Sequence, residues 1–198
     1  MEDHGTMEEA ILEVEQGTTL DYQHPEQKRT LHFAFASTLA FILYSTLVLD
    51  PVGKCFRLEG SSNSLGLTFT YTLQMVEDFF ELRSQNQLEC YREFLQLWDV
   101  IFAVIYASMY GFWIMYFFNN RRVFLIAPLL AMVADWIENI TEILMINGYL
   151  DSNTISGTLV SVGSGINAVK WMMLTLTYLI LIAGIVTKIR SFLRKTDQ

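Results

Sequence analysis

Three stretches of this chain carry no charged residue over nearly the length of a membrane-spanning helix: Phe33–Leu49, Ile101–Phe118 and Trp171–Thr187. Roughly 17–25 apolar residues in helical form cross the hydrocarbon core of a bilayer. A fourth apolar stretch, Val123–Ile146, is less regular because it contains acids. A soluble bundle of 198 residues could not hide three helices that are apolar on nearly every side. The sequence therefore predicts an all-α integral membrane protein, a bundle of four spanning helices.

The composition agrees with one membrane domain between two charged tails. Only 17% of the residues are charged, against about 25% in soluble domains. We expect an acidic tail at 1–30, the membrane domain at 31–190 and a basic tail at 191–198. The expected helices lie at about 31–49, 97–118, 123–147 and 164–188, and a long loop at 50–96 joins the first two.

Lys and Arg residues gather on one side of the predicted bundle. That side, with both chain ends and the turn between the second and third helices, carries Lys28, Arg29, Arg121, Arg122, Lys188, Arg190, Arg194 and Lys195. The opposite side carries Lys54, Arg57, Arg83 and Arg92. Because short cytoplasmic loops are enriched in Lys and Arg, both termini are expected in the cytosol, with a plasma membrane or endomembrane favoured.

The acidic tail is expected to remain part of the protein. Eight acids lie in Met1–Glu26, and this segment has neither the basic start nor the cleavage site of a signal peptide. The first helix would then act as an uncleaved signal anchor. The tail itself is interpreted as a flexible solvating segment or an acidic docking segment, with a short helix around Met7–Glu15.

The loop at 50–96 is predicted to be exoplasmic and partly helical. Its apolar residues Leu73, Val76 and Phe80 recur at helical spacing, together with Phe79, and Thr72 is a suitable cap. This pattern predicts a short amphipathic helix, followed by a helix that runs directly into the second spanning helix. The amphipathic helix would lie either on the membrane surface or as a lid over the bundle.

Both cysteines of the chain, Cys55 and Cys90, lie in this loop. A pair confined to the exoplasmic side is typical of a disulfide, although two cysteines can also share a loop by coincidence. A thiol redox enzyme is disfavoured because the two cysteines do not form a C-x-x-C pair.

The third predicted helix carries a polar stripe. Asp135, Glu138, Asn139 and Glu142 stand at offsets of 0, 3, 4 and 7, which keeps them on one helical face. Each acid costs about 2.5 kcal/mol or more near a bilayer centre, so the stripe needs partners or water. It is therefore the strongest indication of a site in this sequence.

One lysine is expected to meet this stripe. At 1.5 Å per residue, Lys170 in the fourth helix and Asp99 in the second reach the depth of Glu138 and Glu142, with Asp135 near the midplane. Lys170 is the only cation within the spans, and Glu138 or Glu142 is its natural partner. One interpretation is a structural ion pair that sets the helix register. The other is a polar pocket, open to the outer side, with surplus negative charge.

Three functions are compatible with such a pocket. The leading hypothesis is a non-catalytic protein that binds a lipid-like or amine-bearing small molecule or a partner membrane protein. Assembly into a homo- or hetero-oligomer is compatible with this hypothesis. The second is a lipid- or isoprenoid-modifying enzyme with a catalytic carboxyl, and the third is a small proton-coupled transporter. The candidate ligand-binding residues are Asp99, Asp135, Glu138, Asn139, Glu142 and Lys170, and the candidate catalytic residues are Glu138, Glu142 and Asp135.

Other chemistries lack the residues they need. A di-metal or zinc site requires histidines near the acids, but His4, His24 and His32 all lie in or beside the N-terminal tail, so no metal is expected. No phosphate loop or basic nucleic-acid surface is present in the sequence, and no cofactor can be named. Tyr106 and Tyr110 in the second helix are interpreted as packing residues rather than a cofactor site.

The chain resembles a family of uncharacterised four-helix integral membrane proteins found mainly in bacteria. The matching stretches are Tyr91–Tyr106 around Asp99, Pro128–Asn139 (PLLAMVADWIEN), and Val169-Lys170-Trp171. The resemblance extends from about Tyr71 to Ile185 and departs from the family at Ala103, where a proline is common, and in its longer acidic tail. It implies the four-helix architecture and supports the choice of site residues, but it implies no activity.

Overall fold

The structure, a computed structural model, describes residues 26–58 and 64–196. The predicted acidic tail up to residue 25, with its short helix and two of the three histidines, lies outside the described residues. Within them the chain is helical, with no strand. Four helices there are long and apolar enough to cross a membrane: Glu26–Gly53, Gln85–Phe117, Arg122–Ser152 and Gly157–Arg194.

The first and second long helices each contain a π-helical turn. The first ends with η1 (Ser45–Leu49) and α2 (Asp50–Gly53). The second consists of α4 (Gln85–Glu93), η3 (Phe94–Trp98) and α5 (Asp99–Phe117). The third is η4 (Arg122–Leu125) followed by α6 (Ile126–Ser152), and the fourth is α7 (Gly157–Thr196). Two short elements, η2 (Leu65–Leu67) and α3 (Leu73–Glu81), lie in the loop after the first helix.

The four long helices extend beyond the ranges expected from hydropathy. The second begins at Gln85 rather than at about 97, in agreement with the helix predicted to run directly into it, and the fourth begins at Gly157 rather than 164. Hydropathy detects only the apolar middle of a helix, whereas polar end turns continue the same hydrogen-bond ladder. Ser84 caps α4 through a capping box with Gln87.

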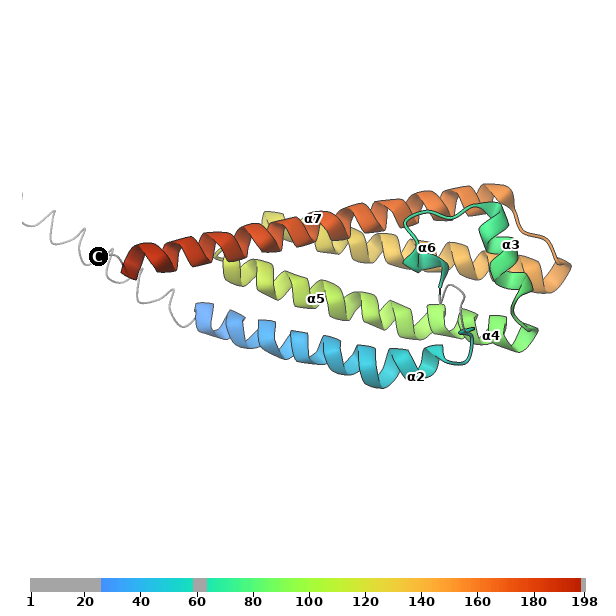
Figure 1. The fold of residues 1–198 in the computed structure, drawn as a ribbon, viewed down its shortest axis with the longest axis horizontal. Helices are drawn as coiled ribbons and strands as arrows, with labels where there is room; N and C mark the ends of the chain where they lie inside the picture. The colour runs from blue at the N-terminus through green and yellow to red at the C-terminus, as the bar shows by residue number, and fades with distance from the viewer. Residues whose placement is uncertain (1–25, 59–63, 197–198) are drawn as a thin grey trace, which may run out of the picture.

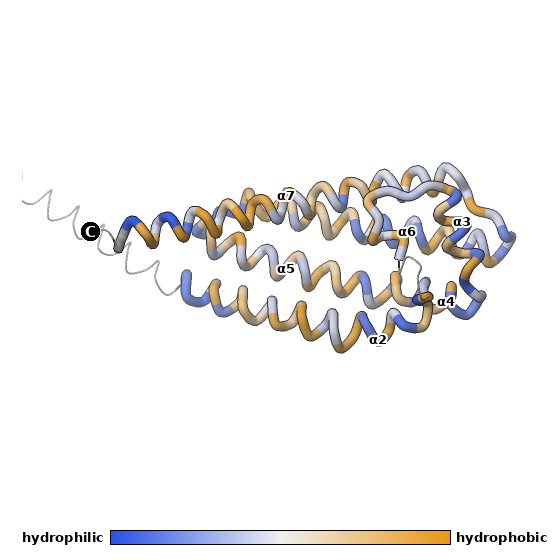
Figure 2. The backbone as a smooth tube through the Cα atoms, in the orientation of Figure 1, coloured by the Kyte–Doolittle hydropathy of each residue, from blue (hydrophilic) through white to orange (hydrophobic). Residues whose placement is uncertain are grey.

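The long helices run side by side, and the segment with α3 and α4 covers one end of the bundle (Figure 1). We call this the loop end and the opposite one the terminal end. The start of the first helix and the end of α7 both lie at the terminal end (Figure 1). Figure 2 shows hydrophobic residues along the middle of the bundle and hydrophilic residues gathered toward its ends.

The helices differ greatly in how much of their apolar surface other parts of the chain cover. In the most apolar window of the first helix 6% of residues are buried, against 39% in that of the third. Phe35 and Leu47 on the first helix are 60% and 68% exposed. Exposed apolar surface of this extent suits a lipid environment better than water.

The loop end has its own hydrophobic core. Phe56, Val76, Phe80, Leu88 and Met145 are all buried there, so the loop, α3, α4 and α6 pack together. Thr72 caps α3 by accepting a hydrogen bond from the Met75 amide, as predicted. Of the four apolar residues predicted to form one face of α3, Val76, Phe79 and Phe80 are buried.

A disulfide and the Arg83 side chain fasten the first part of the loop to the rest of the loop end. A disulfide joins Cys55 to Cys90, with Cα atoms 6.4 Å apart. Arg83 donates to the Phe56 and Phe79 carbonyls at 2.9 and 2.8 Å and lies over the Phe79 ring. Burial lowers the pKa of the Arg83 guanidinium. These contacts hold the loop over the end of the bundle.

Candidate functional site

The polar stripe of α6 faces the interior of the bundle. Asp135, Glu138, Asn139 and Glu142 are each at most 5% exposed. Ile140, on the other side of the same helix, is 57% exposed. The offsets of three and four residues therefore place the acids together, away from the exposed apolar surface of α6.

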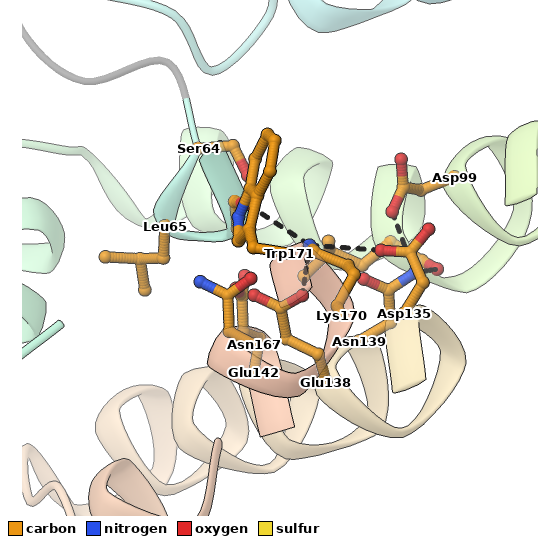
Figure 3. A network of polar contacts seen from close by, with 12 residues as sticks. Ser64, Leu65, Asp99, Asp135, Glu138, Asn139, Glu142, Asn167, Lys170 and Trp171 are labelled. Carbon is orange, nitrogen blue, oxygen red and sulfur yellow. Dashed lines mark hydrogen bonds and ion pairs between the residues drawn. The ribbon is translucent and has the colours of Figure 1, made fainter. Parts of the chain in front are cut away.

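Lys170 from α7 lies at the centre of this stripe (Figure 3). Its Nζ contacts Glu138 Oε2 and lies 3.1 Å from Asp135 Oδ1. It also donates to the Gly66 carbonyl at 3.1 Å, and the indole N–H of Trp171 donates to the same carbonyl at 3.1 Å. An ammonium group has three N–H donors, so these three acceptors use all of them.

Glu142 is held from the loop end. Tyr91 in α4 donates its hydroxyl hydrogen to Glu142 Oε2. The same hydroxyl lies 2.9 Å from Ser64 Oγ and accepts from the Leu65 amide at 3.3 Å. Tyr91 is fully buried, so it connects the loop to the stripe through a chain of hydrogen bonds shielded from solvent.

Asp99 and Asp135 have neutral hydrogen-bond donors as well. The Asn139 side-chain amide donates to Asp99 Oδ2 at 2.9 Å. The Tyr106 hydroxyl donates to Asp135 Oδ2 at 3.2 Å. Asp135 therefore has both a lysine and a tyrosine as partners, whereas the only partner of Asp99 among the described side chains is an amide.

Several buried polar atoms in this cluster have no hydrogen-bond partner among the described residues. They include one carboxyl oxygen each of Glu138 and Glu142, and the side-chain oxygen of Asn167. Glu138 and Glu142 are both 0% exposed. A buried polar group without a partner costs roughly 1–3 kcal/mol. A proton shared by the two carboxyls, or a donor on a bound molecule, would satisfy the two glutamate oxygens.

A cavity of about 310 Å³ lies against this cluster. All four long helices and the loop line it, and Asp99, Asp135, Asn139, Glu142 and Lys170 form its polar wall. The volume is at the lower end of small-molecule sites, which span roughly 300–1,000 Å³.

Aromatic rings form much of the remaining wall. They are Phe41, Phe56, Phe94, Phe102, Tyr106, Tyr110, Trp171 and Tyr178. Two of them, Tyr110 and Tyr178, join α5 to α7 through hydroxyls 2.8 Å apart. The cavity thus combines a charged wall with apolar and aromatic surface, as sites for small amphiphiles do.

The structure brings the six sequence-predicted binding residues into one cluster. Lys170 pairs with Glu138, one of its two expected partners, and with Asp135, which the depth argument had placed nearer the midplane. Glu142, the other expected partner, is bound by Tyr91 instead. His32 is remote from the acids, with Nδ1 2.7 Å from the Lys28 carbonyl oxygen.

Sequence reasoning did not assign to the site the residues that complete the cluster, and it interpreted Tyr106 as a packing residue. Tyr91 and Tyr106 stand eight residues before and seven after Asp99, so helical periodicity could have placed both on its face. Asn167 precedes Lys170 by one turn and could have been found in the same way. Gly66 carried no usable signal, because its contribution is a backbone carbonyl in a loop.

The described residues contain no group of three or more His, Cys, Asp or Glu side chains placed to hold a metal ion. Three comparisons with known proteins, against family models, curated sequences and solved structures, find no match to this chain. The resemblance to four-helix bacterial membrane proteins therefore stays a prediction, and the function has to be argued from the site itself.

Proposed function

We propose that this chain is a multi-pass membrane protein that binds a small lipid-like molecule, without converting it, in the cavity beside Lys170. The observation that carries the proposal is the cavity itself, which has acids and a lysine on one wall and aromatic rings on the others. A molecule with one polar group and an apolar body would match both surfaces. Its polar group would also supply donors or acceptors to the cluster.

The membrane assignment rests on the four long helices. Each is longer than the roughly 20 residues that cross a bilayer, and their mean hydropathy is 1.7 to 2.0. The excess of Lys and Arg at the terminal end supports cytosolic termini and an exoplasmic loop end. Leu73 and Met75 of α3 are 38% and 40% exposed, which supports contact between this helix and the membrane surface.

This topology has a direct test. Tags at either terminus should become accessible to antibody only after the membrane is permeabilised to expose its cytosolic side. A tag inserted between residues 59 and 63 should be accessible from the opposite side. The reverse pattern would contradict the orientation and leave the cavity unaffected.

Binding is favoured over catalysis by the contacts that the charged groups already make. Lys170 already contacts three acceptors, so it is not free to act as an acid or base, and Glu142 is bound by Tyr91 through one of its two oxygens. Turnover by Glu138, Glu142 or Asp135 and proton-coupled transport remain hypotheses. Glu138→Gln would change the chemical identity of a retained molecule only if the protein is an enzyme.

The binding proposal is tested by filling the cavity. Leu174 lines the cavity from α7, whereas Leu176, on the same helix, is 44% exposed on the outer surface. Native mass spectrometry of gently extracted protein should show a retained small molecule on the wild type and on Leu176→Trp, and its loss on Leu174→Trp. Equal retention by both tryptophan variants would overturn the proposal.

A further inference from the structure

Asp99 and Glu142 differ from the other two acids of the cluster in what they contact. Asp135 and Glu138 share Lys170, and Glu142 has the Tyr91 hydroxyl. Asp99 accepts a hydrogen bond only from the neutral Asn139 amide, through one of its two oxygens. Within the described part of the chain its other oxygen has no partner, and the side chain lines the cavity. Asp99 and Glu142 are therefore the two acids without a cation among the described residues, and Asp99 is the less buried of the two.

The remaining cations of the cavity are already engaged. The three donors of Lys170 are directed to Glu138, Asp135 and the Gly66 carbonyl. Arg57, at the loop end of the cavity, bonds Asp50 through Nη1, whereas its buried Nε has no hydrogen-bond partner among the described residues. Four acids therefore face one lysine, and a proton shared between Glu138 and Glu142 would still leave negative charge in excess. At this wall an anionic ligand would add to the excess of negative charge, whereas a cationic ligand would reduce it.

The surroundings of Asp99 also suit a cation. Phe102 and Tyr106 follow it by three and seven residues, so they lie on the same face of α5 and line the same cavity. The Phe102 ring stacks on Phe41 of the first helix, with centroids 5.4 Å apart, and meets the Tyr106 ring edge-on at 5.6 Å. Aromatic faces attract ammonium groups by roughly 0.5–2 kcal/mol.

A second, independent feature points to a missing donor. One oxygen of Glu142 is buried without a partner among the described residues, although Glu142 is 0% exposed and lines the cavity. An ammonium group brings up to three N–H donors and a positive charge. It is therefore the ligand group that best matches the unsatisfied acceptors of this wall.

We infer that the molecule bound in this cavity is an amphiphilic amine, with its ammonium group paired to the Asp99 carboxylate and its apolar body along the rings of Phe102 and Tyr106. This inference rests on the proposed binding function and adds the charge of the ligand and the residue that recognises it. Asp99 is a binding residue in this account, and Lys170 is a structural counter-ion for its neighbours.

The test uses three compounds with the same body and different head groups: 4-phenylbutylamine, 4-phenylbutan-1-ol and 4-phenylbutyrate. Saturable thermal stabilisation of the full chain in lipid nanodiscs gives the affinity for each. The wild type should bind the amine roughly tenfold or more tightly than the alcohol, and the acid least. Because this comparison needs no variant, it stands even if a substituted protein fails to fold.

Asp99→Asn then identifies the recognising residue. The substitution retains an oxygen that can accept from Asn139 and removes only the charge. It should abolish the preference for the amine and leave the affinity for the alcohol unchanged. Asp151→Asn, which neutralises an exposed acid of α6, is the matched control and should behave as the wild type.

The outcomes separate this inference from the proposed function. If the alcohol or the acid binds wild type as tightly as the amine, or if Asp99→Asn keeps the preference, the amine inference is wrong and a binding cavity remains. If none of the three binds and Leu174→Trp loses no retained molecule, both are wrong. Dodecylamine, added through the bilayer, distinguishes the source: tighter binding than 4-phenylbutylamine, with the same dependence on Asp99, indicates a membrane amine rather than a soluble one.

Discussion

The two ends of this bundle are held together by different interactions. At the loop end, Lys170, Tyr91 and Asn139 each bond a carboxylate on another helix, and the Gly66 carbonyl closes the cluster from the loop. Toward the terminal end the helices meet mainly through rings, such as Phe33 on Phe112, with centroids 5.4 Å apart. Hydrogen bonds and ion pairs at the loop end require specific donor and acceptor atoms, whereas ring contacts tolerate small shifts of the helices.

This difference indicates where the stability of the chain depends on single residues. A buried carboxylate that loses its donor keeps its full desolvation penalty, while a ring that loses a neighbour can repack against lipid or another side chain. We therefore expect the same kind of substitution to cost more at the loop end.

Lys170→Met should have the largest effect. It leaves Asp135 and Glu138 buried without their cation, and breaking a buried ion pair costs about 3–5 kcal/mol. The measurement is the free energy of unfolding in bicelles under added SDS. Lys188→Met, an exposed lysine of α7, is the control and should cost less than about 1 kcal/mol. Adding Asp135→Asn and Glu138→Gln to Lys170→Met should recover part of the loss, and equal costs for the two lysine variants would contradict the account.

Removal of the disulfide should come next. Cys55 and Cys90 are 35 residues apart in sequence, and loops of this size are stabilised by about 2–4 kcal/mol when closed by a disulfide. The Cys55→Ser, Cys90→Ser variant should lose amide-hydrogen protection in α3 and α4 before α5 and α7. Uniform loss over all four long helices would show that the loop end is not a separate unit.

Two tyrosines give the most direct comparison of the ends. Tyr106→Phe removes a donor to the Asp135 carboxylate, which should cost about 1.5–3 kcal/mol. Tyr110→Phe, one turn further toward the terminal end, removes only a hydroxyl pair with Tyr178 and should cost about 0.5–1.5 kcal/mol. The unfolding free energies of the two variants check this order. The reverse order would refute the proposed contrast.

The smallest changes in stability are expected at two glycines, and the two changes should have opposite signs. A Cβ on Gly66 would lie 3.0 Å from Glu138 Oε1 and 3.1 Å from Lys170 Nζ, so Gly66→Ala should destabilise by about 1 kcal/mol. Gly165 in α7 has no atom within 4 Å of such a Cβ, so Gly165→Ala should stabilise by about 0.5–1 kcal/mol through helix propensity. Thermal unfolding of both variants in one detergent measures the pair. If Gly66→Ala stabilises as Gly165→Ala does, the loop does not close tightly on the ion pair.

The helices and the polar stripe could be predicted because they depend on local patterns. Offsets between Asp135 and Glu142 place the acids on one face whatever the rest of the chain does, and depth along α7 brings Lys170 to their level. Which of the two glutamates, Glu138 or Glu142, pairs with Lys170 depends on the rotation of α7 about its axis. Because α7 is apolar on nearly every side, its sequence does not define that rotation.

The parts of the site that escaped prediction depend on tertiary structure. Gly66 contributes through a carbonyl that only the fold of the loop brings to Lys170. The cavity is a gap between side chains of four helices, and no periodicity in one helix reports a gap. Tyr91 lies in a segment predicted to be helical, but its contact with Glu142 depends on how α4 and α6 pack together.

The central claim is that the cavity beside the charged cluster is a binding site for a small molecule. A crystal structure of the wild type, extracted gently and grown in a lipid mesophase, tests it most directly. The account predicts elongated non-protein density in the cavity, with its polar end within hydrogen-bonding distance of Asp99 and its body along Phe102. A cavity filled only by ordered water, or closed by side chains that repack onto Lys170, would contradict it.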